Sequence, residues 1–94
     1  MNWEQKLAAL QAITETVLCM RKPGDWYVSA TSRGIAGDGV VHGAYGNGKT
    51  PAEAVEDDWR QIVEMLPSDR YILVERGSKR HHYRWNGFMW RDER

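Results

Sequence analysis

The chain has 94 residues, with 13 Lys or Arg against 13 Asp or Glu, so its formal net charge is zero. This is the length of a single domain, and neutrality gives no global attraction to nucleic acid or to an anionic membrane. No long apolar run or signal-peptide pattern occurs, so we expect one soluble, cytoplasmic domain over residues 1–94 without membrane association. Cys19 is the only cysteine, which excludes an intramolecular disulfide and a cysteine-based metal site. Its apolar neighbours predict a buried thiol.

The first third of the chain predicts a helix followed by a hairpin. Large apolar residues recur at helical spacing over residues 2–13, and Asn2 is placed to cap this helix. Residues 16–21 are rich in strand formers, and residues 26–32 form the return strand. Residues 22–25 between them contain Pro and Gly in the order that suits a type II turn.

The middle of the chain predicts a loop, a strand and a second helix. Residues 34–39 contain three glycines and are expected to form a flexible loop before a strand over residues 40–45. Thr50 is placed to cap the helix, Pro51 suits its first position, and Glu53 would complete a capping box. Its buried stripe is expected to comprise Val55, Trp59, Ile62 and Leu66. Its solvent side is expected to carry Glu56, Asp57 and Asp58.

The last third predicts three strands. Residues 71–74 form the first of them, and a turn at residues 76–79 follows. Asn86-Gly87, between two aromatic-rich runs, is typical of a two-residue type I′ turn, because both central residues of that turn need positive φ. In this register Trp85 pairs with Phe88 and Tyr83 pairs with Trp90. The aromatic face then carries Tyr83, Trp85, Phe88 and Trp90, and the basic face carries Arg80, His82, Arg84, Met89 and Arg91.

These elements predict an α+β domain in the order α-β-β-β-α-β-β-β. Strands joined by hairpins pair antiparallel, so we expect one antiparallel β-sheet of five or six strands, with the two helices packed on one face. The aromatic face of the last hairpin would close the core under the helices, and its basic face would point outward. The last strand would lie at an edge of the sheet that is open to dimerisation.

Two families resemble parts of the chain, most closely at residues 43–66. The α-β-β-β-α order of residues 2–66 and the Gly-rich approach to the second helix resemble the double-stranded-RNA-binding domain. That family places lysines at the start of this helix to hold phosphates, whereas here Lys49 is followed by several acidic residues. The segment Gly48-Lys49-Thr50-Pro51-Ala52-Glu53-Ala54 is similar to the Gly-x-Thr-x-x-Glu-Ala turn of HicB-type antitoxins. Those proteins use a partial RNA-binding-like fold to occlude a toxin.

The chain as a whole resembles small accessory proteins of tailed phages. Those proteins often combine a Gly-Asn-Gly-Lys-Thr-Pro-x-Glu-Ala stretch, which residues 46–54 match in style, with short Trp-rich termini. They include inhibitors of bacterial defence systems and sponges for nucleotide signals. This resemblance implies a counter-defence role in the cytoplasm of a host cell.

The remaining patterns do not indicate catalysis. Residues 43–50 fit the Gly-x4-Gly-Lys-Thr spacing of a phosphate-binding loop, but Pro51 follows at once and no parallel sheet is evident. A looser anion site at this helix N-terminus, with Lys49 and Asn47, is the alternative. His81 and His82 are adjacent, so they point to opposite faces of a strand and cannot share one metal. We expect no enzymatic activity, no metal and no cofactor.

The basic row, defined as Arg80, His82, Arg84 and Arg91, is the remaining pattern that could indicate a binding site. The alternative is that it is a solvated face of the sheet. Arginine forks bind phosphates, and aromatic rings stack on bases. We therefore expect a non-enzymatic binding or inhibitor protein that sequesters or blocks an anionic target. The target would be a nucleotide-like signal or a nucleic-acid-handling host protein, and a second copy of the chain would be a further partner. The alternative is a HicB-like antitoxin or an RNA-binding regulatory module that uses residues 46–53. The expected binding residues are Arg80, His82, Arg84, Arg91, Trp85, Trp90, Lys49 and Asn47.

Overall fold

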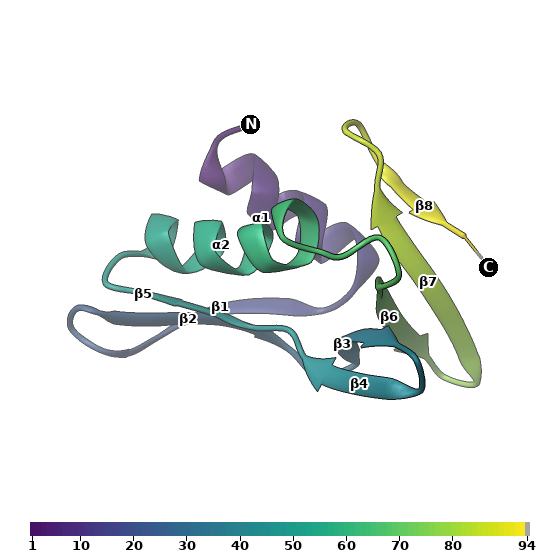
Figure 1. Ribbon diagram of the computed structural model, residues 1–94. Coiled ribbons are helices and arrows are strands. Elements are labelled where there is room, and N and C mark those ends of the chain that lie inside the picture. The colour runs from purple at the N-terminus through teal and green to yellow at the C-terminus, as the bar shows by residue number, and fades with distance from the viewer. Residues whose placement is uncertain (94) are drawn as a thin grey trace.

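The computed structural model describes residues 1–93, and Figure 1 shows how their helices and strands are arranged. The elements are α1 Trp3–Ile13, β1 Thr16–Lys22, β2 Asp25–Ala30, β3 Arg33–Gly37, β4 Val40–Gly43, β5 Gly46–Gly48, α2 Pro51–Trp59, the π-helical turn η1 Arg60–Glu64, β6 Tyr71–Arg76, β7 Lys79–Trp85 and β8 Trp90–Asp92. Neither α-helix is long and apolar enough to span a bilayer, within the described residues.

All strand pairs are antiparallel, and the strands form two sheets. The first sheet has the order β1-β2-β5, and the second sheet has the order β4-β3-β6-β7-β8. The predicted α+β class and element order are confirmed, and β3 and β5 are short strands added to that order. The strands divide between two sheets, where one sheet of five or six strands was expected. The α-β-β-β-α unit of residues 2–66 takes β5 as its third strand, and the β3–β4 hairpin is inserted before it.

Both helices cover one face of the first sheet (Figure 1). Asn2 caps α1, because its side chain accepts the N–H of Gln5 at 2.8 Å while the Gln5 side chain accepts the N–H of Asn2 at 2.9 Å. Thr50 caps α2 by accepting the N–H of Glu53 at 3.1 Å, and Pro51 occupies the first turn, both as predicted. The carboxylate of Glu53 reaches back to the N–H of Lys49 at 3.2 Å.

The helix α2 lies directly on β5 because that strand has glycine at the positions that face it. A Cβ atom at Gly46 would lie 2.5 Å from the amide nitrogen of Asp58, and one at Gly48 would lie 2.5 Å from the amide nitrogen of Ala54. Val28, Ala54 and Val55 are fully buried in the core between this helix and the first sheet. The absence of side chains at Gly46 and Gly48 therefore sets the distance between the helix layer and the sheet.

A second core lies between the helices and the inner face of the second sheet, which rises beside the helix ends in Figure 1. Trp59 of α2 is its centre, with its ring centroid 5.0 Å from that of Trp85 and 5.9 Å from that of Trp90. The indole N–H of Trp90 donates to the carbonyl oxygen of Ala9 at 2.7 Å and so ties β8 to α1. The buried members of this core are Leu10, Ile13, Ala44, Trp59, Ile62, Ile72 and Val74.

Two local expectations from the sequence are wrong in this part of the chain. The predicted flexible loop at residues 34–39 is instead β3 followed by a tight turn, in which Asp38 and Gly39 have φ of 53° and 76° and join Gly37 to Val40. Cys19 is half-buried where a buried thiol was expected. It pairs with Tyr27 on the face of the first sheet opposite to the buried Val28, and the helices leave that face uncovered.

Candidate functional site

The last hairpin has a different turn from the one predicted. Trp85 pairs with Trp90 and Arg84 pairs with Arg91, so four residues, 86–89, form the loop. The side chain of Asn86 accepts the N–H groups of Phe88 and Met89, both at 2.9 Å, and this competes with a two-residue turn. The predicted pairing of Trp85 with Phe88 is therefore wrong.

The correction shifts the register by two residues, and a shift of two leaves each strand residue on its predicted face. Tyr83, Trp85 and Trp90 pack against the second core, as expected of the aromatic face. Phe88 and Met89 leave the strands and lie in the loop, where Phe88 is 89% exposed. The predicted aromatic binding residues Trp85 and Trp90 are thus half-buried against this core.

The basic row lies on the outer face of the second sheet, but its members have different surroundings. Arg84 donates to the carbonyl oxygens of Arg70, Pro67 and Ser68, so its guanidinium group holds the chain that leads into β6. His82 stacks on Tyr71 with a ring-centroid distance of 4.2 Å. The other two members, Arg80 and Arg91, are exposed, and Arg80 forms an ion pair of 3.4 Å with Glu75.

A shallow trough lies beside the basic row on this outer face. It exists because β3 presents only Gly34 and Ala36 there, whereas the neighbouring strands present the larger residues Val41, Tyr71 and Leu73. Two adjoining hollows of about 210 and 170 Å³ form the trough, and Val41 and Leu73 line both of them. Arg80 and His82 line the second hollow, together with Tyr71. The structure thus combines an apolar floor with the guanidinium group of Arg80, and the ion-pair partner of Arg80, Glu75, lines the first hollow.

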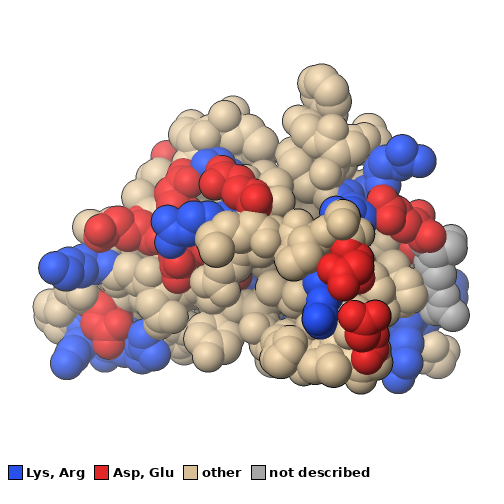
Figure 2. Space-filling model, in the orientation of Figure 1, with Lys and Arg blue, Asp and Glu red and all other residues tan. Residues whose placement is uncertain are grey.

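The predicted anion site at the start of α2 is occupied by the chain's own carboxylates. The N–H of Asn47 donates to Asp57 at 2.9 Å, and the N–H of Lys49 donates to Glu53 at 3.2 Å. The side-chain oxygen of Asn47 accepts from Arg21 at 2.6 Å. This segment lines a hollow of about 730 Å³ in which acidic and basic side chains are mixed, so an incoming anion would meet carboxylates there. Figure 2 likewise shows both signs of charge interspersed over the helices.

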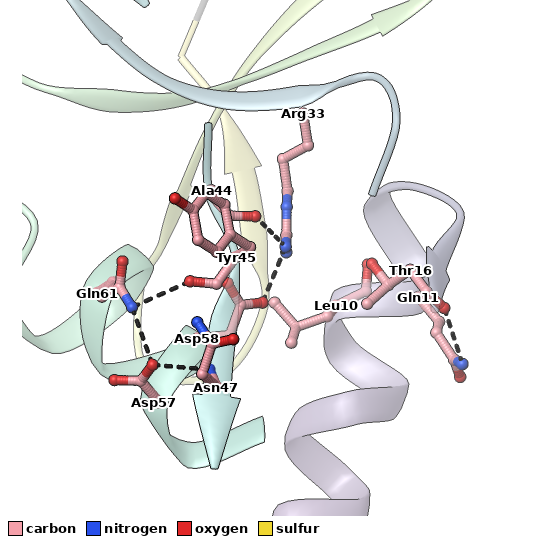
Figure 3. A network of polar contacts seen from close by, with 10 residues as sticks. All are labelled: Leu10, Gln11, Thr16, Arg33, Ala44, Tyr45, Asn47, Asp57, Asp58 and Gln61. Atoms are coloured by element: carbon pink, nitrogen blue, oxygen red, sulfur yellow. Dashed lines mark hydrogen bonds and ion pairs between the residues drawn. The ribbon is translucent and has the colours of Figure 1, made fainter. Parts of the chain in front are cut away.

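A buried ion pair links α2 to the second sheet (Figure 3). Arg33, at the start of β3, donates to the carboxylate of Asp58 and to the carbonyl oxygen of Ala44, each at 2.8 Å. Both charged side chains are fully buried, so the expectation that Asp58 lies on the solvent side of α2 is wrong. Arg33 Nε and Nη1 and Asp58 Oδ1 are buried without a hydrogen-bond partner, which makes the compensation of these charges incomplete.

This pair predicts an unusual dependence of stability on pH. Burial raises the pKa of the Asp58 carboxyl group from 3.8 to about 6, against the opposing attraction of Arg33. The folded chain then binds this proton more tightly than the unfolded chain, so the contribution of Asp58 to the free energy of unfolding falls by about 3 kcal/mol between about pH 4 and pH 6. Urea denaturation of the wild type and of the Arg33→Met/Asp58→Leu double variant should show this slope in their difference. A difference that is constant over this range would contradict the assignment.

Comparison with protein-family models, with curated proteins and with solved structures gave no match to this chain. Among residues 1–93, no group of three or more His, Cys, Asp or Glu side chains is arranged to hold a metal ion. The fold and the site together define an α+β protein with an uncovered sheet face, a trough on that face and an uncharged hairpin tip. The resemblances to antitoxins, RNA-binding domains and phage accessory proteins stay predictions.

Proposed function

We propose that the protein is a non-enzymatic binding protein that sequesters a flat, anionic small molecule, such as a nucleotide, on the outer face of the second sheet. The observation that carries this proposal is the trough, which joins an apolar floor at Val41 and Leu73 to the exposed arginine at position 80. In a tailed phage, such a protein would act in the host cytoplasm against a nucleotide signal.

Different parts of the trough would bind the ring and the phosphate of such a ligand. A planar ring would lie on Val41 and Leu73, where contact removes apolar surface from water. Its phosphate would pair with Arg80, whose present ion pair with Glu75 joins side chains that are 65% and 51% exposed. Exposed ion pairs contribute little free energy, so a phosphate can replace Glu75 at the guanidinium group. His82, fixed by its stack on Tyr71, borders the same hollow.

This proposal changes the roles of the predicted binding residues. Arg80, His82 and Arg91 remain candidates for direct contact with a ligand. Arg84 acts as a positioning residue, because it holds the backbone of residues 67–70. Trp85 and Trp90 support the hairpin from the core side. Asn47 lies on β5 of the first sheet, and Lys49 follows that strand, so both are away from the trough.

Thermal unfolding with a panel of nucleotides and cyclic nucleotides tests the proposal. A ligand at about a hundred times its Kd would stabilise the fold by about 2.7 kcal/mol, which raises Tm by about 10–20 °C for a domain of this size. We expect Arg80→Gln to remove the increase. Arg60→Gln is the matched control, because Arg60 is also an exposed arginine (54%) that pairs with a carboxylate, that of Asp57 at 2.7 Å. The absence of any increase, or an equal loss in both variants, would contradict the proposal.

A second candidate function is an RNA-binding or HicB-like regulatory module that uses residues 46–53. The unit α1-β1-β2-β5-α2 supports it, since its order is the one that the resemblance to the double-stranded-RNA-binding domain implies. The carboxylates of Glu53 and Asp57 oppose it, because they lie where phosphates would approach. Binding to duplex RNA should be measured at low salt, where phosphate contacts are strongest. Absence of binding under that condition would exclude the RNA-binding form of this candidate.

A further inference from the structure

Among the described residues that line the trough, one cation and one anion face the solvent. Arg80 lines the second hollow, and Glu75 lines the first hollow. Arg33 also lines the first hollow, but its guanidinium group is fully buried against Asp58 on the inner side of the sheet (Figure 3). The guanidinium group that would bind a phosphate therefore has a carboxylate beside it, and the two charges cancel.

The strand register keeps this carboxylate close to the guanidinium group. Glu75 of β6 is paired directly with Arg80 of β7, and their charged groups are 3.4 Å apart. The N–H of Glu75 also donates to the carbonyl oxygen of Ser32 at 3.0 Å, which fixes the backbone at this position. Directly paired residues have Cβ atoms about 5 Å apart, so a phosphate that takes over the guanidinium group leaves the carboxylate within about 7 Å.

A carboxylate held at this distance opposes every negative charge that a ligand carries. Two unit charges about 7 Å apart in water change a dissociation constant by about threefold, and the effect multiplies with each further charge. The first charge of a phosphate is compensated by direct contact with Arg80. Each further charge is repelled by Glu75 and must also leave water, so it gains little from the same guanidinium group. Such opposition selects among ligands as effectively as attraction does.

We propose that Glu75 limits the trough to ligands whose phosphate carries a single negative charge. This inference rests on the proposed function and names its ligand class, which is a phosphodiester nucleotide such as a cyclic nucleotide. A cyclic phosphodiester carries one negative charge, whereas a terminal phosphate carries nearly two at neutral pH. Nucleoside mono-, di- and triphosphates are then disfavoured, and a large pool of them would not fill the site.

Calorimetric titration with three phosphate forms of each common nucleoside tests this inference. The probes are the 3′,5′-cyclic monophosphate, the 5′-monophosphate and the 5′-triphosphate, at pH 8, where histidine is ordinarily neutral. The wild type should bind the cyclic form of its preferred nucleoside at least as tightly as the other two forms. Glu75→Gln should lower the Kd of the cyclic form by about threefold and that of the 5′-monophosphate by about ninefold. The preference should therefore shift toward the more highly charged ligand.

Glu56→Gln is the matched control, because Glu56 is also exposed (45%) and pairs with a cation, Lys6 at 2.6 Å, but lies on α2. This variant should leave every Kd unchanged. A wild type that prefers the 5′-monophosphate or the 5′-triphosphate would overturn the charge limit and leave the proposed binding site in place. A Glu75→Gln variant that tightens all three forms equally, or none of them, would do the same. Binding of no form to either protein would contradict the proposed function itself, and the charge limit with it.

Discussion

Replacing Arg33 with methionine is expected to lower the free energy of unfolding by about 3–5 kcal/mol. In the wild type both side chains of the pair are fully buried. The change therefore leaves the carboxylate of Asp58 buried without its charge partner. It also removes the donor to the carbonyl oxygen of Ala44, at the point where the β3–β4 hairpin returns to the first sheet. Urea denaturation of the single variant at neutral pH measures the loss.

The double variant Arg33→Met/Asp58→Leu separates the charge effect from a packing effect. Apolar replacement of a whole buried pair is often neutral, or stabilising by about 1–4 kcal/mol, because neither charge then has to leave water. The partnerless atoms of Arg33 and Asp58 place this pair among those that are incompletely compensated. We therefore expect the double variant to be at least as stable as the wild type. A double variant as unstable as Arg33→Met would show that the site needs the charges themselves.

Replacing Gly46 with alanine is expected to lower the free energy of unfolding by at least about 3 kcal/mol, at or above the usual range for overpacking. The added Cβ atom would meet the carbonyl oxygen of Ala54 and the amide nitrogen of Asp58. Both are backbone atoms of α2, so no side-chain rotation relieves the contact, and the helix must move away from the first sheet. Urea denaturation measures the effect.

Gly43→Ala is the control for this prediction, because it makes the same chemical change three residues earlier. A Cβ atom at Gly43 would meet only the ring of Tyr45, at 3.5 Å, which is an ordinary contact distance. The control should be within about 0.5 kcal/mol of the wild type. If both variants lose stability equally, the loss would come from backbone flexibility and not from the approach of α2.

Two of the Gly-containing turns show how far local sequence signals predicted the fold. Asp38-Gly39 forms the two-residue turn with positive φ at both positions, although the surrounding glycines suggested a loop. Asn86-Gly87 has the stronger signal for such a turn, yet it lies in a four-residue loop. In the second case the core decided the register, since pairing Trp85 with Trp90 lets both rings pack with Trp59. Packing between distant elements cannot be deduced from a dipeptide.

The burial of Asp58 could have been predicted from helical periodicity, but the acidic residues beside it suggested the opposite. Position 58 lies three residues after Val55 and four residues before Ile62, so helical periodicity places it on the buried stripe. A run of three acidic residues suggested a solvated surface instead. Its partner Arg33 lies on a strand that the sequence did not reveal. The faces of the last hairpin could be predicted from the alternation of its residues alone. The trough depends on β3, and this strand was missed because its glycines suggested a loop.

The placement of β3 has a consequence for the order in which the chain folds. Residues 33–36 pair with residues 71–74, so the second sheet must close a long loop, and such contacts form slowly. During synthesis, α1, α2 and the first sheet can assemble before residues 71–92 leave the ribosome. Until then Trp59 has no Trp85 or Trp90 to cover it. A stage in which only this half is built would therefore leave the Trp59 ring exposed to other chains.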